Sequence, residues 1–273
     1  NAFNPAPNGQ CWHRDFPDQS PWVFERKFEL DSWASVLYLA RMITEKYGRI
    51  DHIDASFKET LSLMIKLAKL EQNHDPESYI FKRNNDVPHD SLSHNGRGAP
   101  TAYTGMVYSA FRPSDDACMY GYLVPSNLFF LNELEQLPET LKSLESQNLA
   151  KAIRTGVERF AIIDGKYAYE VDGHGNALFI DDANIPSLLT LPLLGCISPN
   201  DELYAATREF ILSEKNPYYF SGAKAAGIGS QHTPTGFVWP IAIAAQALTD
   251  PLQSKKLEAL DLLENTDAGT GSM

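Results

Sequence analysis

The stretch Phe111-Arg-Pro-Ser-Asp-Asp-Ala-Cys-Met-Tyr-Gly-Tyr-Leu-Val-Pro-Ser-Asn127 places two adjacent acids among apolar residues. Successive residues of a helix point about 100° apart, so only one of Asp115 and Asp116 can face a given site squarely. The other acid would cap the chain or pair with a cation such as Arg112. The same letters also fit an ordinary helix start, with Ser114 as the N-cap and both acids in the first turn. The two interpretations are compatible, because a helix start can present a catalytic acid.

Composition places the chain among globular proteins and narrows its partners. It has 273 residues, of which 43% are hydrophobic and 21% are charged. The net charge of −12 argues against nucleic acid and anionic membranes as partners and suits a neutral substrate. The three cysteines are widely spaced and match neither a metal motif nor a disulfide framework. We expect no membrane segment in this chain, and no signal peptide is visible, so no compartment is predicted.

Apolar residues recur at helical spacing along most of the sequence. They predict a helix from Leu30 that Gly48 ends, and a second helix that Asp54 caps and that runs to about residue 71. The pattern between Lys166 and Ile180 alternates instead and predicts a β-hairpin. Further helices are predicted at 126–135, from Pro138 to about 160, from Pro186, at 200–213, 235–249 and 250–263.

These elements predict a helix-dominated fold with long polar loops. There is no alternation of strands and helices and no glycine-rich phosphate loop, which argues against a nucleotide-binding α/β protein. Sugar sites need carboxylates, amides and guanidinium groups for hydroxyls, and aromatic faces for the pyranose ring. Each such residue also has a structural interpretation; a lone histidine, for example, is more often hydrogen-bonded within the fold. The loops supply candidates of every required kind: Arg26, Asp31, Arg112, Tyr120, Asp182, Asn184, Tyr218, His232 and Trp239.

Four motifs in order resemble the exo-α-1,6-mannosidases of glycoside hydrolase family 125, which include fungal proteins described as meiotically up-regulated. Together they extend over nearly the whole chain, which makes the resemblance specific. The motifs are Ser20–Ser32, Arg112–Ala117 with Tyr120–Asn127, Ile180–Leu189, and Asn216–Phe220 continuing through Gly227–Pro234 to Trp239-Pro240.

The resemblance implies an all-α dominated fold, an (α/α)6 barrel, here incomplete, with one β-hairpin near 166–180. Residues 1–273 would form a single, partial catalytic domain of this kind. The family's Thr-Gly-Asp and Trp-Leu-Arg-Asp-Ser motifs do not occur in this sequence, and neither does its His-Glu-Ser-Phe motif. We therefore expect a chain cut at both ends, with negligible mannosidase activity by itself.

The resemblance also implies inverting hydrolysis of terminal α-1,6-linked mannose. The general acid would be Asp115 or Asp116, and the base would be the glutamate of His-Glu-Ser-Phe, beyond the C-terminus of this sequence. Neither a metal nor another cofactor is expected. The substrate would be an α-mannoside or an oligosaccharide derived from an N-glycan. Asp115 or Asp116, Arg112, Asp182 and His232 would then line one concave surface. The alternatives are a carbohydrate-binding protein without catalysis and an inactive fragment.

Overall fold

The computed structural model describes residues 2–74, 77–84 and 87–266. The chain forms two compact units. Unit 1 comprises Asn1–Ala161 and Glu170–Ala177, and unit 2 comprises Ile162–Tyr169 and Leu178–Met273. The prediction that the sequence stops short of a family motif concerns its last residues, 270–273. These residues lie outside the described part.

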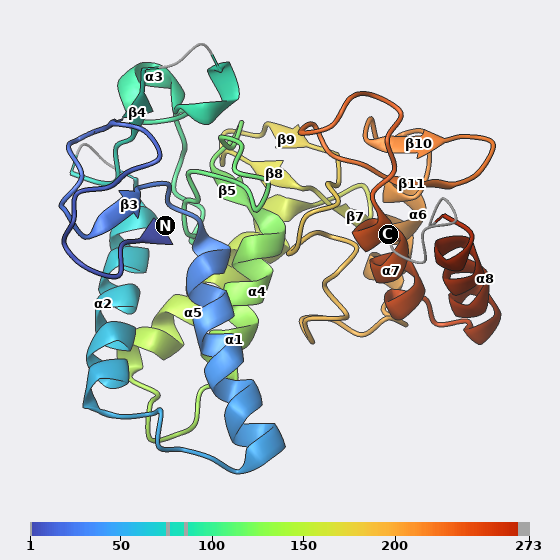
Figure 1. Ribbon diagram of the computed structural model, residues 1–273. Helices are drawn as coiled ribbons and strands as arrows, with labels where there is room; N and C mark the ends of the chain where they lie inside the picture. Colours follow the sequence, from blue (N-terminus) through green and yellow to red (C-terminus); the bar gives the residue numbers. More distant parts are fainter. Residues whose placement is uncertain (1, 75–76, 85–86, 267–273) are drawn as a thin grey trace. The chain divides into compact units, whose positions relative to one another are not determined.

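The described residues of unit 1 form four helices of 12 to 18 residues and three short helical turns. Figure 1 shows α1 beside α4, and α4 packs in turn on α5, while α2 also contacts α5. The helical elements of the unit are α1 (Leu30–Tyr47), α2 (Ala55–Glu71), the 3-10 turn η1 (Pro88–Asp90), α3 (Ser93–Gly96), α4 (Val124–Glu135), α5 (Leu144–Gly156) and the π-helical turn η2 (Val157–Ala161).

The ends of the first two helices follow local chemistry, and their prediction is confirmed. Gly48 adopts the left-handed conformation after α1, with φ of 65°, and its N–H donates to the carbonyl of Thr44. Asp54 caps α2 by accepting a hydrogen bond of 2.8 Å from the N–H of Phe57. The helices then bury one apolar face each, as the periodicity predicts.

Short antiparallel strand pairs hold the loops of unit 1. In each pair, the two strands come from separate loop segments, so pairing fixes where the loops run. The pairs are β1 (Ala2–Phe3) with β3 (Val23–Glu25), β2 (Asp15–Phe16) with β4 (Lys82–Arg83), and β5 (Tyr122–Leu123) with β8 (Glu170–Val171).

Unit 2 combines two β-hairpins with three helices. Helices α7 and α8 pack on each other around Ile243, Ala247, Ala259 and Leu263. Its elements are β6 (Ile162–Ile163), β7 (Lys166–Tyr167), α6 (Glu202–Ile211), β10 (Tyr219–Ser221), β11 (Ala226–Ile228), α7 (Pro240–Thr249) and α8 (Gln253–Glu264). The short strand β9 (Ala177–Leu178) lies where the chain passes into this unit.

The predicted hairpin at 166–180 is confirmed in its inner part, where β8 and β9 are neighbours in one sheet with β5, but not at its start. Strand β7 pairs with the preceding strand β6 in an antiparallel hairpin. The turn between them is Asp164-Gly165, whose φ angles of 50° and 70° are those of a tight hairpin turn. This Asp-Gly pair is a hairpin signal that the predicted pairing did not use. The loops expected to carry Tyr218 and His232 also contain regular structure, because β10 and β11 form a second hairpin between these residues.

Several predicted helix starts are wrong. The helix expected from Pro138 begins at Leu144, the one expected at residue 235 begins at Pro240, and two others are absent from the described residues. Ser114 begins no helix: residues 111–117 form a loop closed by a bridge between Phe111 and Ala117, and the Ser114 hydroxyl donates to Asp116. No helix begins at Pro186 either. The N–H groups of Leu188 and Leu189 donate to the buried carboxylate of Asp181, so side-chain bonding replaces the helical pattern there.

The prediction of a mostly helical fold is confirmed, and that of one domain over residues 1–273 stays a prediction. In the described part of the chain, none of the helices has both the length and the apolar character that crossing a bilayer requires.

The loop before residue 108 lies directly against the backbone of α5. A Cβ atom on Gly156 would lie 2.6 Å from the carbonyl oxygen of Thr104, and one on Gly105 would lie 2.5 Å from that of Ala152. Real Cβ contacts are never so short, so both glycines are needed for this approach.

We therefore expect Gly156→Ala to destabilise the chain by about 1–3 kcal/mol, because the added methyl group forces two backbones apart. Helix propensity alone would predict the opposite sign, a gain of about 1 kcal/mol. Urea unfolding measures the difference. Gly222→Ala is the control, since a Cβ there would lie 3.7 Å from the carbonyl of Ala225. Equal stability of Gly156→Ala and the unmodified chain would contradict the packing described.

Candidate active site

The loop 111–117 separates its two acids. The side chain of Asp115 is 60% exposed, whereas Asp116 is completely buried. Asp115 has a φ of 65°, unusual for a residue other than glycine, and its N–H donates to the carbonyl of Arg112. The N–H of Arg112 donates in turn to the carbonyl of Asp116. This tight turn presents one carboxylate and buries the other.

Asp116 anchors the loop from inside. The hydroxyl of Ser114 donates to its Oδ2 over 2.6 Å, and Nε2 of His89 lies 3.6 Å from its Oδ1. The next residue, Ala117, donates its N–H to the carbonyl of His89. The contacts of Asp116 are therefore with the protein itself.

A buried glutamate that the sequence analysis missed holds the flanks of this segment. Glu170 in β8 accepts a hydrogen bond of 2.5 Å from Nε of Arg112, and its other oxygen accepts the N–H groups of Met119 and Tyr120. Arg112 is almost entirely buried, and Tyr120 is half-buried. The sequence pattern that could have identified Glu170 is an acid among the apolar residues of a predicted strand.

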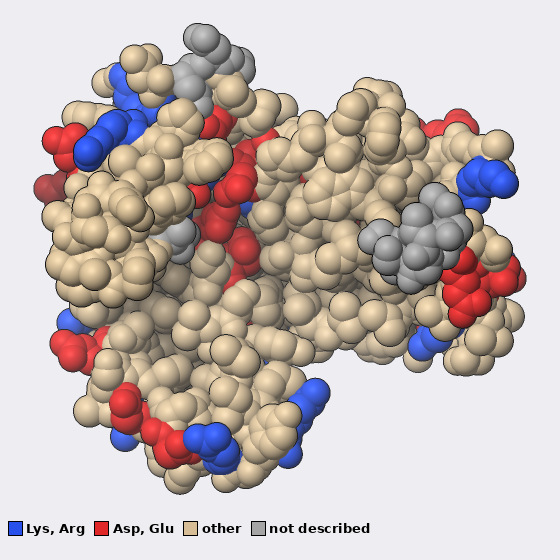
Figure 2. Space-filling model, viewed as in Figure 1, with Lys and Arg blue, Asp and Glu red and all other residues tan. Residues whose placement is uncertain are grey.

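The N-terminal end of α1 adds two more carboxylates beside Asp115. Asp31 accepts a hydrogen bond of 3.2 Å from the Ser126 hydroxyl, and burial raises its pKa to about 6. Burial also raises the pKa of Glu29 to about 7, and the charges of Asp31 and Asp115 add to this effect. Figure 2 shows acidic side chains gathered near this end of α1. Such carboxyl groups can exchange protons near neutral pH, the property that acid–base chemistry needs.

Arg26 is bonded within its own loop. Its Nη1 donates to the carbonyl of Pro17 over 2.8 Å, and its carbonyl accepts the hydroxyl of Tyr79. The half-buried side chain lines a groove with Phe28, Trp33 and Tyr79. Contact between Arg26 and a substrate stays a prediction.

In unit 2, the structure brings together several of the predicted residues. The buried carboxylate of Asp182 accepts the N–H and the side-chain amide of Asn184, at 2.9 and 2.5 Å, and the hydroxyl of Ser230. Ser230 also accepts the N–H of His232, whose side chain is exposed. Asp182 thus joins the loop after residue 180 to the loop after β11.

Trp239 and Tyr218 belong to the same region of unit 2. The indole N–H of Trp239 donates to the Thr233 hydroxyl, and the Tyr218 hydroxyl donates to Gln231. Both residues are half-buried, so part of each remains accessible. This group and the acids around Asp115 lie in different units, and their meeting at one surface stays a prediction.

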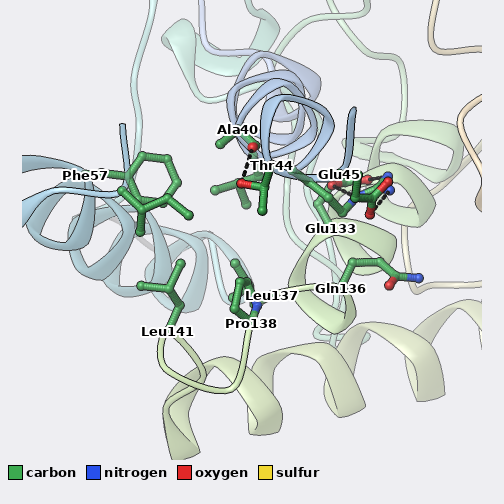
Figure 3. Close-up of a pocket in the computed structure, with 12 residues that line it drawn as sticks. Ala40, Thr44, Glu45, Phe57, Glu133, Gln136, Leu137, Pro138 and Leu141 are labelled. Atoms are coloured by element: carbon green, nitrogen blue, oxygen red, sulfur yellow. Dashed lines mark hydrogen bonds and ion pairs between the residues drawn. The ribbon is translucent and has the colours of Figure 1, made fainter. Parts of the chain in front are cut away.

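A cavity of about 170 Å³ lies elsewhere in unit 1 (Figure 3). Its walls include Thr44, Phe57, Glu133 and Leu141 from α1, α2, α4 and the following loop. Thr44 stands fourteen residues after the start of α1, about 20 Å along a helix. The cavity is therefore remote from the acids at that start and is not part of the candidate site.

Comparison with known proteins shows the family to which the chain belongs. The model of the family described as metal-independent alpha-mannosidase, glycoside hydrolase family 125, matches residues 1–273. The chain belongs to this family. The segments 111–127 and 180–189, on which the sequence resemblance rests, contain the hydrogen-bonded acids Asp116 and Asp182 described above.

Two relatives show how much of a family member the sequence covers. The meiotically up-regulated gene 157 protein of Schizosaccharomyces pombe is 38% identical over 307 residues, which include the whole chain and 60% of that protein. A solved structure of a Streptococcus pneumoniae protein, described as a non-productive substrate complex with alpha-1,6-mannobiose, is 39% identical. It matches with a TM-score of 0.94 over the whole chain and 68% of its own. The chain thus spans 60% of the length of the first relative and 68% of the second.

The raised pKa of Glu29 makes the stability of this family member depend on pH. Between its ordinary pKa of 4.5 and about 7, the folded chain holds a proton on Glu29 that the unfolded chain has lost. The free energy of unfolding therefore falls as pH rises through this window.

We expect Glu29→Gln to remove that part of the pH dependence of the free energy of unfolding, measured in urea titrations from pH 4 to 8. Glu139→Gln, at a side chain 84% exposed, is the control and should leave the slope unchanged. An unaltered slope in Glu29→Gln would contradict the assignment.

Proposed function

We propose that this chain is the greater part of an exo-acting α-1,6-mannosidase. It would hydrolyse non-reducing terminal α-1,6-linked mannose from an α-mannoside or an N-glycan-derived oligosaccharide, with inversion at the anomeric carbon. The family match over all of 1–273 carries the proposal. The relative that is 39% identical and described as a complex with alpha-1,6-mannobiose supports this choice of linkage.

We further propose that both units belong to one (α/α)6 barrel. The barrel is what the family resemblance implies, and the TM-score of 0.94 over the whole chain supports a fold shared with the Streptococcus pneumoniae structure. In such a barrel, loops at one rim would carry the site, and the Asp115 and Asp182 clusters would share that rim.

Asp115, rather than Asp116, is the proposed general acid. A general acid must reach the glycosidic oxygen, and Asp115 is the exposed member of the pair, held in a restrained turn. Left-handed backbone at a residue other than glycine also favours a functional position. Asp116 is buried and accepts a hydrogen bond from Ser114, so it would stabilise the loop instead. The proposed base is the glutamate of the His-Glu-Ser-Phe motif, which is absent from this sequence.

The remaining candidates would bind the sugar. Asp31, together with the neighbouring Glu29, offers carboxylate oxygens to hydroxyl groups. His232 and Asn184 offer further polar groups, and Trp239 offers an aromatic face for the pyranose ring. The Nε of Arg112 donates a hydrogen bond to Glu170, so Arg112 would mainly position the acid loop.

The test compares leaving groups in the complete natural protein that carries this sequence. We expect Asp115→Asn to slow hydrolysis of α-1,6-mannobiose by about 10²–10⁴-fold, because the poor leaving group needs a proton. An aryl α-mannoside with an activated leaving group should lose far less. Asp116→Asn is the matched control: it should lower thermal stability and affect both substrates equally.

Equal losses on both substrates in Asp115→Asn would contradict its role as the acid. Binding of α-1,6-mannobiose without hydrolysis by the unmodified protein would favour the alternative of a carbohydrate-binding protein. An unmodified protein that neither binds nor hydrolyses α-1,6-mannobiose would contradict the proposed function altogether.

A further inference from the structure

Lys27 is a buried cation directly behind the exposed acid. Only 5% of its side chain is accessible, which is rare for lysine. It lies just before α1, 88 positions from Asp115 in the sequence. Burying an ammonium group is costly unless its charge and its hydrogen bonds are matched, so its partners show what it does.

The ammonium group bridges η1 and the acid loop. Its Nζ lies 2.6 Å from Oδ1 of Asp90 and donates a hydrogen bond of 2.8 Å to the backbone carbonyl of Asp115. The carboxylate of Asp115 is further away, at 3.8 Å, beyond hydrogen-bond length. The ring of Phe111 covers the cation, with its centroid 5.0 Å from Nζ.

Asp90 is therefore the closer counter-ion of Lys27, and the carboxylate of Asp115 forms only a longer ion pair with it. Asp90 is itself fixed, because both of its oxygens accept hydrogen bonds from Nη1 of Arg83, at 3.0 and 3.1 Å. Arg83 in turn binds Asp15 and Glu25 at 2.8 Å each. The carbonyl of Asp115 is thus attached to a buried ion network, while its carboxylate stays exposed.

The backbone of Asp115 needs such an attachment. A φ of 65° costs about 1–2 kcal/mol relative to the right-handed region for a residue with a side chain. The hydrogen bond from Lys27 to its carbonyl holds the peptide that follows Asp115. The neighbouring Phe28 contributes a second contact, since its carbonyl accepts the N–H of Phe111.

We propose that Lys27 is a positioning residue for the acid, holding the Asp115 carbonyl so that the Asp115 carboxylate points out of the loop toward the substrate. The catalytic part of this inference rests on the proposed function. Lys27 does not contact the substrate itself, because its side chain is buried and its short contacts are within the protein.

The test uses Lys27→Met, which keeps the length of the side chain and removes the charge, in the complete natural protein. A misplaced acid should cost about 10²-fold in kcat on α-1,6-mannobiose, with far less effect on an activated aryl α-mannoside and little change in KM. Hydrogen exchange gives a readout independent of activity. The peptide 111–117 should exchange about tenfold faster, because its turn opens more often.

Arg41→Met is the matched control. Arg41 makes two hydrogen bonds to the buried Glu133 at 2.8 and 2.9 Å, beside the cavity of Figure 3 and remote from Asp115. It should lower stability and speed exchange near that cavity, with equal effects on the two substrates. If Lys27→Met does not fold, Asp90→Asn should show the same leaving-group dependence and faster exchange of 111–117 in milder form.

Equal losses on both substrates, with unchanged exchange in 111–117, would overturn the role of Lys27. If the unmodified protein hydrolyses no α-mannoside, the proposed function fails. The attachment is then decided by hydrogen exchange: faster exchange of 111–117 in Lys27→Met supports it, and unchanged exchange overturns it.

Discussion

The buried guanidinium of Arg83 is the constraint on which the candidate acid site depends. Its side chain is 1% exposed and binds carboxylates of Asp15, Glu25 and Asp90. These partners come from β2, β3 and η1, which are separate in sequence. A charge so far from water requires complete pairing, so the three segments must meet around it. Through Asp90 and Lys27, this requirement extends to the carbonyl of Asp115.

The acids of the chain divide according to the groups that they bind. Glu170 and Asp181 are fully buried, and each accepts two backbone N–H groups. Although burial raises the pKa of Asp181 to about 8, these N–H bonds favour its charged form and oppose the shift. Such carboxylates fix loops that have no regular structure. Asp115, by contrast, remains open to solvent.

Unit 2 also contains a buried carboxylate that fixes loops through hydrogen bonds. Asp182 is buried and joins Asn184 to Ser230, so two loops far apart in sequence share one carboxylate. The exposed His232 and half-buried Trp239 stand on the second of these loops. In both units, a buried acid supports the segment, and the side chains suited to a sugar lie next to it.

The sequence by itself determined the helices α1 and α2 with their ends, because Gly48, Asp54 and the apolar periodicity act over a few residues. The family motifs also pointed to the loop 111–117, whose part in catalysis stays a prediction. The sequence failed where side-chain hydrogen bonds within a loop decide. Ser114 looks like a helix cap but donates to Asp116, and the N–H groups that follow Pro186 donate to Asp181 instead of starting a helix. The difference between Asp115 and Asp116, and the parts played by Lys27 and Glu170, depend on contacts 58 and 88 positions apart. Only tertiary structure decides these, because burial of charge is a property of the folded chain and not of neighbouring letters.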